Sequence, residues 1–365
     1  MEDVFLAVIG AGQAGLATAR AANRRGVRPL VLEAAEEPGG SWSHYYDSLT
    51  LFSPARFSSL PGHALPGDPE RYPRRDEVVS YLREYASRVD ADLRYGWRVE
   101  GVEHDGEEFV LTTGDGNRVR AAAVVAATGG FTRPHRPALA GLDGFTGTVL
   151  HAAEYRSPAS FTGQRVVVVG GGNSGVQIAA ELAGVARVSL ATRSPVAWAN
   201  QRPLGRDIHW WFTRSGLDAA PLRRVWEKGP TLVNDDGRYR AAFASGNPDR
   251  REMFTLLDGD KVIWADGSTD KADTLVLATG YRPALDYLAP TGALDTAGCP
   301  LHRGGISTTV PGLGYVGLEF QRSFSSATLR GVGRDARHVM RRLLSREGRH
   351  GSAVAGRARG ENRPG

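Results

Sequence analysis

The stretch Gly10-Ala11-Gly12-Gln13-Ala14-Gly15 decides the fold of this 365-residue chain. An apolar run at 4–9 precedes it, a small-residue helix pattern at 14–23 follows, and a second apolar run comes at 29–33. In such a unit the first glycine permits a tight turn, the second lets a pyrophosphate approach the backbone, and the third lets helix and strand pack closely. The sequence therefore predicts a βαβ unit that holds a dinucleotide at the helix N-terminus.

The same pattern returns 160 residues later. Gly170-Gly171-Gly172-Asn173-Ser174-Gly175 stands between an apolar run at 166–169 and a helix pattern at 176–183, and another apolar run follows at 188–191. Two fingerprints of this kind predict two dinucleotide sites in one chain.

The two copies differ at the position that reads the ribose. Glu33 stands 23 residues after Gly10, whereas Arg193 stands 23 residues after Gly170 and is followed by Ser194. A carboxylate accepts hydrogen bonds from ribose hydroxyls but repels a 2′-phosphate, which a guanidinium can pair with. We expect FAD at the first turn and NADPH at the second. The same two residues are also compatible with no role in binding. Glu33 would then be a solvated glutamate at a strand end, and Arg193 an exposed structural arginine.

The repeat continues beyond the glycine turns. In each copy an Asp-Gly turn, at Asp115 and at Asp266, lies 14 residues before the glycine of an apolar run that ends in Ala-Thr-Gly. This spacing predicts an α/β fold of two Rossmann-like domains, each with a small β-meander. We expect a discontinuous FAD domain at 1–155 and 281–345, an inserted NADPH domain at 156–280, and a disordered tail at 346–365.

Composition narrows the function further. The single cysteine, Cys299, excludes the cysteine pair of a disulfide reductase. No apolar run reaches the length of a membrane span, so we expect a cytoplasmic protein. The net charge of +5 comes from arginines scattered among acidic residues, and the basic stretch 334–349 has apolar residues at helix spacing. We therefore expect a terminal amphipathic helix and no nucleic-acid partner; a homodimer stays open.

A longer motif joins the two halves. Phe145, Gly147, His151 and Tyr155 form an FxGxxxHxxxY pattern. With Gly39-Gly40-Ser41-Trp42 and Ala278-Thr279-Gly280-Tyr281, it makes nearly the whole chain resemble the class B flavin-dependent monooxygenases. That group holds FMO-type N- and S-oxygenases, plant YUCCA enzymes and Baeyer–Villiger monooxygenases. The resemblance implies that His151 belongs to an interdomain hinge near NADP and is not a proton-transfer base.

The resemblance also implies an activity. NADPH would reduce FAD, the reduced flavin would form a C4a-(hydro)peroxide with dioxygen, and a small organic or soft nitrogen or sulfur substrate would be oxygenated. The flavin carries this chemistry, so no side chain is named as catalytic and no metal is expected. Because the motif ends in Tyr155-Arg156, the FMO/YUCCA-like branch is favoured over Baeyer–Villiger oxygenation of a ketone. An electron-transfer reductase and a non-enzymatic flavin-binding regulator are also compatible with two dinucleotide sites.

The candidate site residues fall into two groups. Phe52 stands about where FMO-type relatives place an asparagine near the flavin, and with Trp210, Trp211 and Phe324 it is a candidate for substrate contact. The glycine- and serine-rich segment 323–333 is expected to lead the last helix toward the flavin. The predicted cofactor-binding residues are Gly10, Gly12, Gln13, Ala14, Gly15, Glu33, Gly40, Ser41, Trp42, Val99, Thr128, Gly129, Gly170, Gly172, Asn173, Ser174, Gly175, Arg193, Ser194, Ala278, Thr279, Gly280, Tyr281, Gln321 and Ser325.

Overall fold

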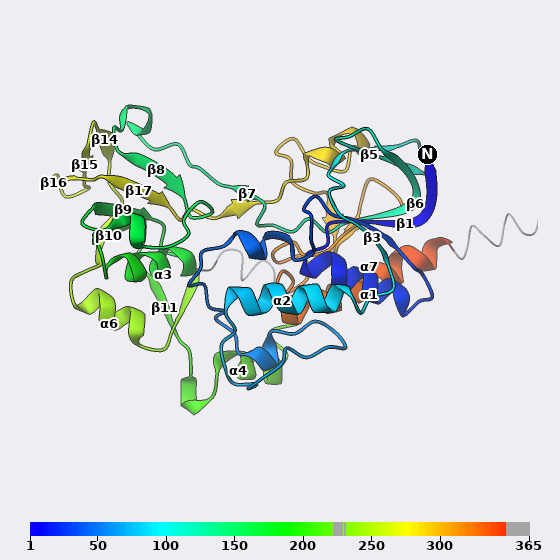
Figure 1. Cartoon of the computed structure of the whole chain (residues 1–365), viewed down its shortest axis with the longest axis horizontal. Helices are drawn as coiled ribbons and strands as arrows, with labels where there is room; N and C mark the ends of the chain where they lie inside the picture. Colours follow the sequence, from blue (N-terminus) through cyan, green and yellow to red (C-terminus); the bar gives the residue numbers. More distant parts are fainter. Residues whose placement is uncertain (222–228, 230, 348–365) are drawn as a thin grey trace, which may run out of the picture.

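The computed structural model describes residues 1–221, 229 and 231–347. Figure 1 shows two lobes, each built on its own sheet and joined by extended segments that include β7 (Arg133–Pro134). Most of the predicted tail at 346–365 lies outside the described residues. No described helix combines the length and apolarity needed to cross a bilayer.

The first lobe has a sheet of nine described strands in the order β19-β20-β21-β6-β1-β2-β3, with β4 and β5 attached to β6 as an antiparallel meander. β1, β2, β3, β6 and β21 pair in parallel. The strands are β1 (Glu2–Ile9), β2 (Leu30–Leu32), β3 (Asp92–Arg94), β4 (Val99–His104), β5 (Phe109–Thr113), β6 (Arg118–Ala126), β19 (His302–Arg303), β20 (Ile306–Ser307) and β21 (Leu313–Tyr315).

The two faces of this sheet are covered differently. Leu6 and Val8 of β1 pack in one buried cluster with α1 (Gln13–Asn23), α2 (Arg75–Ala86) and α7 (Leu329–Glu347). Ala7 and Ile9 point to the opposite face, where they pack with the meander. The alternation follows from the two-residue period of a strand. The lobe therefore has three layers, helices, parallel sheet and meander, as the first half of the repeat predicts.

The second lobe repeats the arrangement with a sheet in the order β13-β10-β9-β17-β8. Val166 and Val168 of β9 face α3 (Asn173–Leu182), and Val167 and Val169 face a three-stranded meander. The sheet strands are β8 (Thr148–His151), β9 (Arg165–Val169), β10 (Arg187–Thr192), β13 (Asp249–Glu252) and β17 (Thr274–Leu277); the meander strands are β14 (Leu256–Asp258), β15 (Lys261–Ile263) and β16 (Thr269–Lys271).

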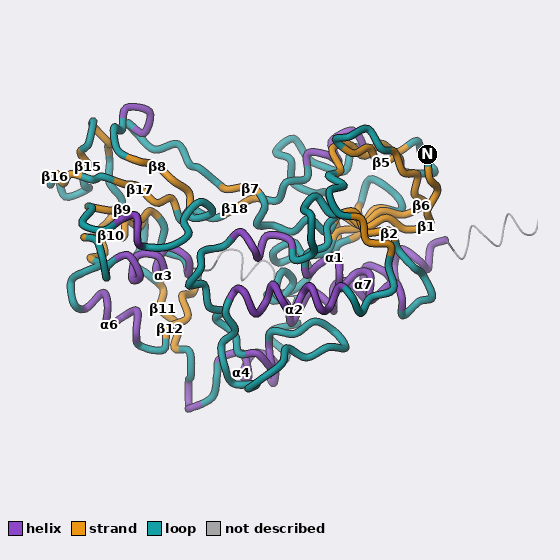
Figure 2. Tube along the Cα trace, in the orientation of Figure 1, coloured by secondary structure: helices purple, strands orange, loops and turns teal. Residues whose placement is uncertain are grey.

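The connections insert the second lobe into the first. The chain leaves the first sheet after β6 and returns to it at β19–β21, where β21 pairs with β6. The outgoing β7 and the returning β18 (Tyr281–Arg282) pair with each other antiparallel. Figure 2 shows this pair between the lobes. Because β8 joins the second sheet, the expected boundary at residue 155 lies after a strand of the other lobe, and we propose a division between β7 and β8.

Several elements lie outside these layers. β11 (Ala197–Asn200) and β12 (Leu232–Asp235) form a two-stranded parallel ribbon, and α6 (Arg238–Ala244) follows it. Between the strands of the ribbon the chain runs through α4 (Ile208–Ser215), which Figure 1 places below α2 of the first lobe. The last helix, α7, begins five residues before the basic stretch from which it was predicted.

Candidate functional site

The first glycine turn joins β1 to α1 with no room for side chains at two positions. A Cβ on Gly15 would lie 1.7 Å from the carbonyl oxygen of Gly10. Gly10 has φ +104°, a conformation that favours glycine, and a Cβ there would lie 2.9 Å from the carbonyl oxygen of Ala127 after β6. The backbone therefore has the tight turn and the close helix packing for which these glycines were singled out.

The start of α1 fits the pyrophosphate of a dinucleotide. Its N-cap residue, Gly12, provides no side-chain hydrogen bond, and the first turn has no acidic residue. The N–H groups at such a helix end, together with the helix dipole, favour an anion. At the end of β2 the buried Glu33 carboxylate accepts hydrogen bonds from the backbone N–H of Ala11 at 2.5 Å and of Ala35 at 3.0 Å. These bonds hold the carboxylate beside the turn.

Two predicted side chains connect this turn to distant segments. The Trp42 indole N–H donates to the Gln13 side-chain oxygen at 3.1 Å, and the Gln13 amide donates to the Ala327 carbonyl at 2.6 Å. Gly40 approaches the turn so closely that a Cβ on it would lie 3.0 Å from the Gly12 Cα. The loop at 39–42 and the segment leading into α7 therefore frame the turn from two sides.

Some of the other residues predicted to contact the first cofactor have side chains that are buried or hydrogen-bonded within the fold. Val99 is buried in the core, the Gln321 amide donates to the Tyr315 carbonyl at 2.8 Å, and Ser325 donates to the Asp218 carbonyl at 2.9 Å. These side chains are already used in the fold, so a cofactor would meet their backbone. Thr128 and Gly129 lie directly after β6, where Thr128 Oγ1 is 3.3 Å from the Tyr287 hydroxyl. The hydroxyl of Ser41 is 3.3 Å from that of Tyr45.

The second glycine turn reproduces the first. A Cβ on Gly175 would lie 1.9 Å from the Gly170 carbonyl oxygen, and one on Gly170 would lie 2.3 Å from the Ala278 carbonyl oxygen. The N-cap of α3, Gly172, makes no side-chain hydrogen bond, and no acid lies in the first turn. Asn173 binds across to the ribbon, donating to the Leu232 carbonyl at 3.2 Å. This helix start, where Ser174 follows, also fits a pyrophosphate.

Arg193 lies just beyond the end of the strand that follows α3. It follows β10 directly, and both Arg193 and Ser194 are exposed. Within the described part of the chain the Arg193 guanidinium forms no ion pair or hydrogen bond, whereas Glu33 at the same offset is buried and hydrogen-bonded. The cation is therefore available to a ligand at the second turn.

The hinge motif fixes the start of the second sheet. A Cβ on Gly147 would lie 2.5 Å from the Asp273 carbonyl oxygen and 2.7 Å from the Phe145 ring, so only glycine fits between them. The buried Tyr155 hydroxyl donates to the Glu181 carboxylate of α3 at 2.8 Å. Phe145 and Tyr155 pack in the clusters on the two opposite faces of the sheet. The motif therefore anchors the connection between the lobes to the second one.

His151 is the hydrogen-bonded centre of that connection. The Ala153 N–H donates to His151 Nδ1 at 3.1 Å, so Nε2 carries the proton and donates to the Gly280 carbonyl, also at 3.1 Å. The ring packs edge-on against Tyr281 with 5.0 Å between centroids. Burial lowers the pKa of His151, an effect that the hydrogen bond to Gly280 opposes. Both ring nitrogens are therefore engaged in hydrogen bonds within the connection between the lobes.

We expect acid to destabilise the fold through this histidine. The unfolded ring binds protons near pH 6.5, and the folded ring binds them only at lower pH, so the free energy of unfolding should fall as the pH drops below about 6.5. A His151→Gln variant should lose part of this pH dependence, which urea unfolding at about pH 5.5 and pH 7.5 measures. His44→Gln, at an exposed position, is the control. Equal slopes for His151→Gln and the wild type would contradict the assignment.

Four tyrosines lie in contacts between the two sites. Tyr46, just beyond the 39–42 loop, donates its hydroxyl to Gln177 of α3 at 2.5 Å, and its ring lies 6.0 Å from that of Tyr155. Tyr45 lies edge-on to Tyr281, which follows the predicted Thr279 and Gly280, at 6.4 Å. Burial raises the pKa of Tyr281 to about 12, so its hydroxyl stays neutral. These contacts connect the segments that follow the two turns, and Arg156 and Arg75 also donate to the Tyr45 carbonyl.

The segment 201–221 leaves the second lobe and binds to the first. The Gln201 amide donates to the Phe52 carbonyl at 3.0 Å, and the Tyr72 hydroxyl donates to Asp207 at 2.6 Å. Farther along, Asp218 pairs with Arg330 at 2.8 Å and with Arg334 at 2.7 Å. The charges of these arginines hold the pKa of Asp218 below its usual value although burial acts to raise it. These contacts fix α4 against the start of α7.

A buried histidine lies beneath Phe52. Asp207 caps α4 and binds His209 Nδ1 at 2.7 Å, and the His209 ring stacks on Phe52 with 5.8 Å between centroids. The rings continue through Phe212, 6.4 Å from His209, to Phe324, 5.6 Å farther on. Burial lowers the pKa of His209, which Asp207 opposes. Phe52 and Phe324, two candidates for substrate contact, therefore lie at the ends of one aromatic row.

The two tryptophans do not join that row. Trp210 and Trp211 pack edge-on against each other at 4.7 Å, and Arg206 lies over the Trp210 ring. Trp211 is exposed and donates its indole N–H to the Pro203 carbonyl at 3.1 Å. Adjacent helical residues point in different directions, so the two rings have different surroundings. Their contact with substrate remains a prediction.

Sequence reasoning did not find Asp207, His209, Asp218 or Arg330. Each is a single polar residue in a stretch without a motif. Asp207 and His209 bind residues of the 52–72 segment, and Asp218, just after α4, pairs with Arg330 of α7, which is more than 100 residues away. Of these four residues, only Asp207 has a recognisable pattern in the nearby sequence. It directly precedes an apolar helix pattern, which is typical of an N-cap residue. Pairing across that distance is set by the tertiary fold.

Comparison with known proteins gives consistent matches along the chain. Residues 7–211 match the family model described as pyridine nucleotide-disulphide oxidoreductase. An uncharacterized oxidoreductase CzcO-like of Geobacillus kaustophilus is 32% identical over 94% of this chain and 99% of its own. Indole-3-pyruvate monooxygenase YUCCA1 of Oryza sativa subsp. japonica is 35% identical over 79% of this chain and 80% of its own.

A solved structure shares both lobes. A variant of the flavin monooxygenase from Stenotrophomonas maltophilia is 33% identical, with a TM-score of 0.84, and the match covers 94% of this chain and 99% of that one. The likeness therefore extends over both lobes and the junction between them.

Proposed function

The chain belongs to the pyridine nucleotide-disulphide oxidoreductase family and, within it, to the class B flavin-dependent monooxygenases, and from that premise we propose an NADPH-dependent oxygenase of small nitrogen or sulfur compounds. The family's cofactors are FAD and NADPH. We assign FAD to the turn at 10–15 and NADPH to the turn at 170–175. The contrast between buried Glu33 and unpaired Arg193 carries this assignment.

The bound flavin supplies hydride acceptance from NADPH and activation of dioxygen. The protein's own part is to bind, orient and protect. The open starts of α1 and α3 would hold the two pyrophosphates, and Tyr46, through Gln177, links the segment after the 39–42 loop to α3. In this proposal Phe52 and Phe324, at the ends of the aromatic row, would provide apolar side chains beside the substrate. No side chain is assigned a proton-transfer step.

We propose nitrogen or sulfur as the oxygenated atom because of the reactivity of these atoms. No positioned acid or base on the protein is part of the proposal. Soft nitrogen and sulfur atoms accept oxygen without a separate proton donor on the protein, and His151 has both ring nitrogens engaged. Oxygen consumption driven by NADPH should therefore increase with a thioether or tertiary amine and not with a cyclic ketone. Stimulation by the ketone alone would favour Baeyer–Villiger oxygenation. NADPH oxidation only in the presence of a quinone or ferredoxin would favour an electron-transfer reductase.

We expect Arg193→Ala to weaken the binding of NADPH but not that of NADH. Loss of the guanidinium removes a charge-assisted pair with the 2′-phosphate, so KM for NADPH should rise by about tenfold or more while KM for NADH stays nearly unchanged. Steady-state kinetics with NADPH and with NADH measure the two KM values. Arg187→Ala, at an exposed position at the start of β10, is the matched control. An equal rise for both nucleotides would overturn the 2′-phosphate assignment.

A further inference from the structure

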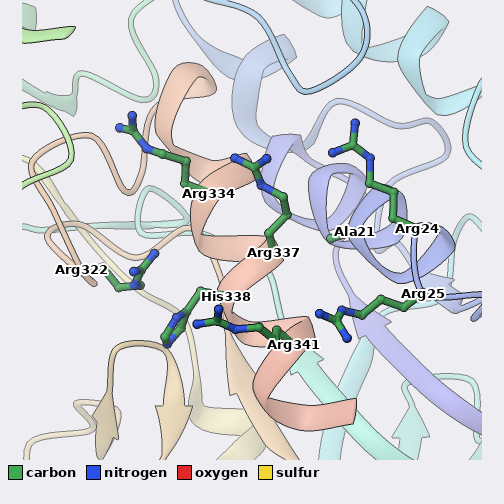
Figure 3. A pocket seen from close by; sticks show the side chains of 8 residues that line it. All are labelled: Ala21, Arg24, Arg25, Arg322, Arg334, Arg337, His338 and Arg341. Carbon is green, nitrogen blue, oxygen red and sulfur yellow. The ribbon is translucent and has the colours of Figure 1, made fainter. Parts of the chain in front are cut away.

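A groove between α1 and α7 of the first lobe is lined mostly by arginines. Figure 3 shows the C-terminal end of α1 on one side and the middle of α7 on the other. The cavity has a volume of about 670 Å³. Its lining residues, here called the arginine groove, are Ala21, Arg24, Arg25, Arg322, Arg334, Arg337, His338 and Arg341.

Most of this charge has no counter-ion among the residues that the structure describes. Arg322 pairs with Asp335 and Arg334 with Asp218, both outside the groove lining. In the described part of the chain, no carboxylate forms an ion pair with any of the other four arginines, and the lining has no acidic residue. The unpaired arginines are Arg24, Arg25, Arg337 and Arg341.

The pKa of His338 is consistent with this concentration of positive charge. Burial lowers its pKa, and the charges of Arg322, Arg341 and Arg342 lower it further. Converging like charges destabilise a fold unless something neutralises them. A ligand with several negative charges is the neutraliser that this groove fits.

The residues that line the groove indicate which class of anion it can bind. It has no Phe, Tyr or Trp side chain, its only ring being the His338 imidazole, and it is concave, with a volume in the range of small-molecule sites, about 300–1,000 Å³. Guanidinium groups match phosphate oxygens geometrically. We propose that the arginine groove binds a compact polyphosphate or multiply phosphorylated metabolite, bridging α1 and α7.

This site is separate from the two nucleotide sites. α1 begins at Gln13 beside the first glycine turn, and the groove uses its other end, at Ala21 and Arg24. Eleven residues of α-helix extend about 16 Å, so one phosphate group cannot serve both ends. A bound anion would instead link the helix of the FAD turn to α7 and stabilise the first lobe.

Inorganic tripolyphosphate is the probe. Calorimetric titration of the FAD-loaded full chain at low salt should show one saturable site, with sulfate at equal ionic strength binding at least about tenfold more weakly, and thermal melting should shift upward by a few degrees. Arg25→Gln/Arg341→Gln should weaken tripolyphosphate by about tenfold or more. The control Arg98→Gln/Arg118→Gln removes the same charge from exposed positions just before β4 and at the start of β6 in the same lobe and should change affinity less than about twofold.

Each other result counts against the site. Absence of saturable binding to the wild type would overturn the proposal without depending on any variant. Equal losses in the groove and control variants would show a diffuse charge effect, and sulfate binding as tightly as tripolyphosphate would show an unselective cationic surface. Binding of a short RNA or of anionic vesicles in place of tripolyphosphate would make the groove part of a macromolecular surface. FAD content and NADPH oxidation, followed in parallel, keep this test independent of the proposed function.

Discussion

Gly15→Ala is expected to yield protein without bound FAD, and Gly175→Ala protein that keeps FAD but no longer binds NADPH. The added methyl group would lie 1.7 Å from the Gly10 carbonyl oxygen in the first variant and 1.9 Å from the Gly170 carbonyl oxygen in the second. Both contacts are with backbone, so the helix must move away from its strand and the pyrophosphate site at its start is lost. Flavin absorbance of the purified proteins and NADPH titration measure the two outcomes.

The controls for this pair are glycines with room for a methyl group. A Cβ on Gly101 of β4 meets nothing within 4 Å, and one on Gly184 after α3 makes only an ordinary contact at 3.5 Å. Gly101→Ala and Gly184→Ala should retain both cofactors. Loss of FAD from Gly175→Ala but not from Gly15→Ala would reverse the assignment of the two turns. Circular dichroism separates loss of cofactor from loss of the whole fold.

Asp218→Asn is expected to reduce the free energy of unfolding by about 3–5 kcal/mol, because it leaves the Arg330 and Arg334 guanidinium groups without their shared counter-charge. The side chains of Asp218 and Arg330 are only 2% and 8% exposed, so water cannot replace the carboxylate. Urea unfolding at neutral pH measures the change. The variant should also release α4 from α7, which limited proteolysis in the 201–221 segment would detect.

The control for Asp218 is an exposed aspartate without a partner among the described residues. Asp143, in a short 3-10 turn, is such a position, and Asp143→Asn should leave the urea midpoint nearly unchanged. An Asp218→Asn variant as stable as the wild type, with unchanged proteolysis, would show that the ion pair does not hold the segment in place. A similar loss in both variants would point to net charge rather than to the buried pair.

The parts of the fold with a strong local pattern could be predicted from the sequence. The two βαβ units, the meanders and the return of the chain after Gly280 all follow from periodicity and from glycines at fixed spacing, and β21 pairs with β6 as that return requires. The boundary expected at residue 155 lies after β8, a short strand that only its pairing with β17 assigns to the second sheet, which is why we propose a division before β8.

The candidate site was predictable only where the backbone defines it. Gly10, Gly15, Gly170 and Gly175 stand where no other side chain fits, and this requirement is visible in the sequence as spacing. The aromatic row from Phe52 through His209 to Phe324 was not predictable, because it assembles three segments that are distant in the chain. Local propensity carries no information about such contacts.

The most direct test of the central claim is the fate of dioxygen. The FAD-loaded protein, supplied with NADPH, a simple thioether and isotopically labelled dioxygen, should form a sulfoxide that carries one labelled oxygen atom for each NADPH oxidised beyond the substrate-free rate. Mass spectrometry of the product measures this ratio. If NADPH is oxidised while the label appears only in hydrogen peroxide or water, whichever thioether, amine or ketone is supplied, the monooxygenase account is contradicted.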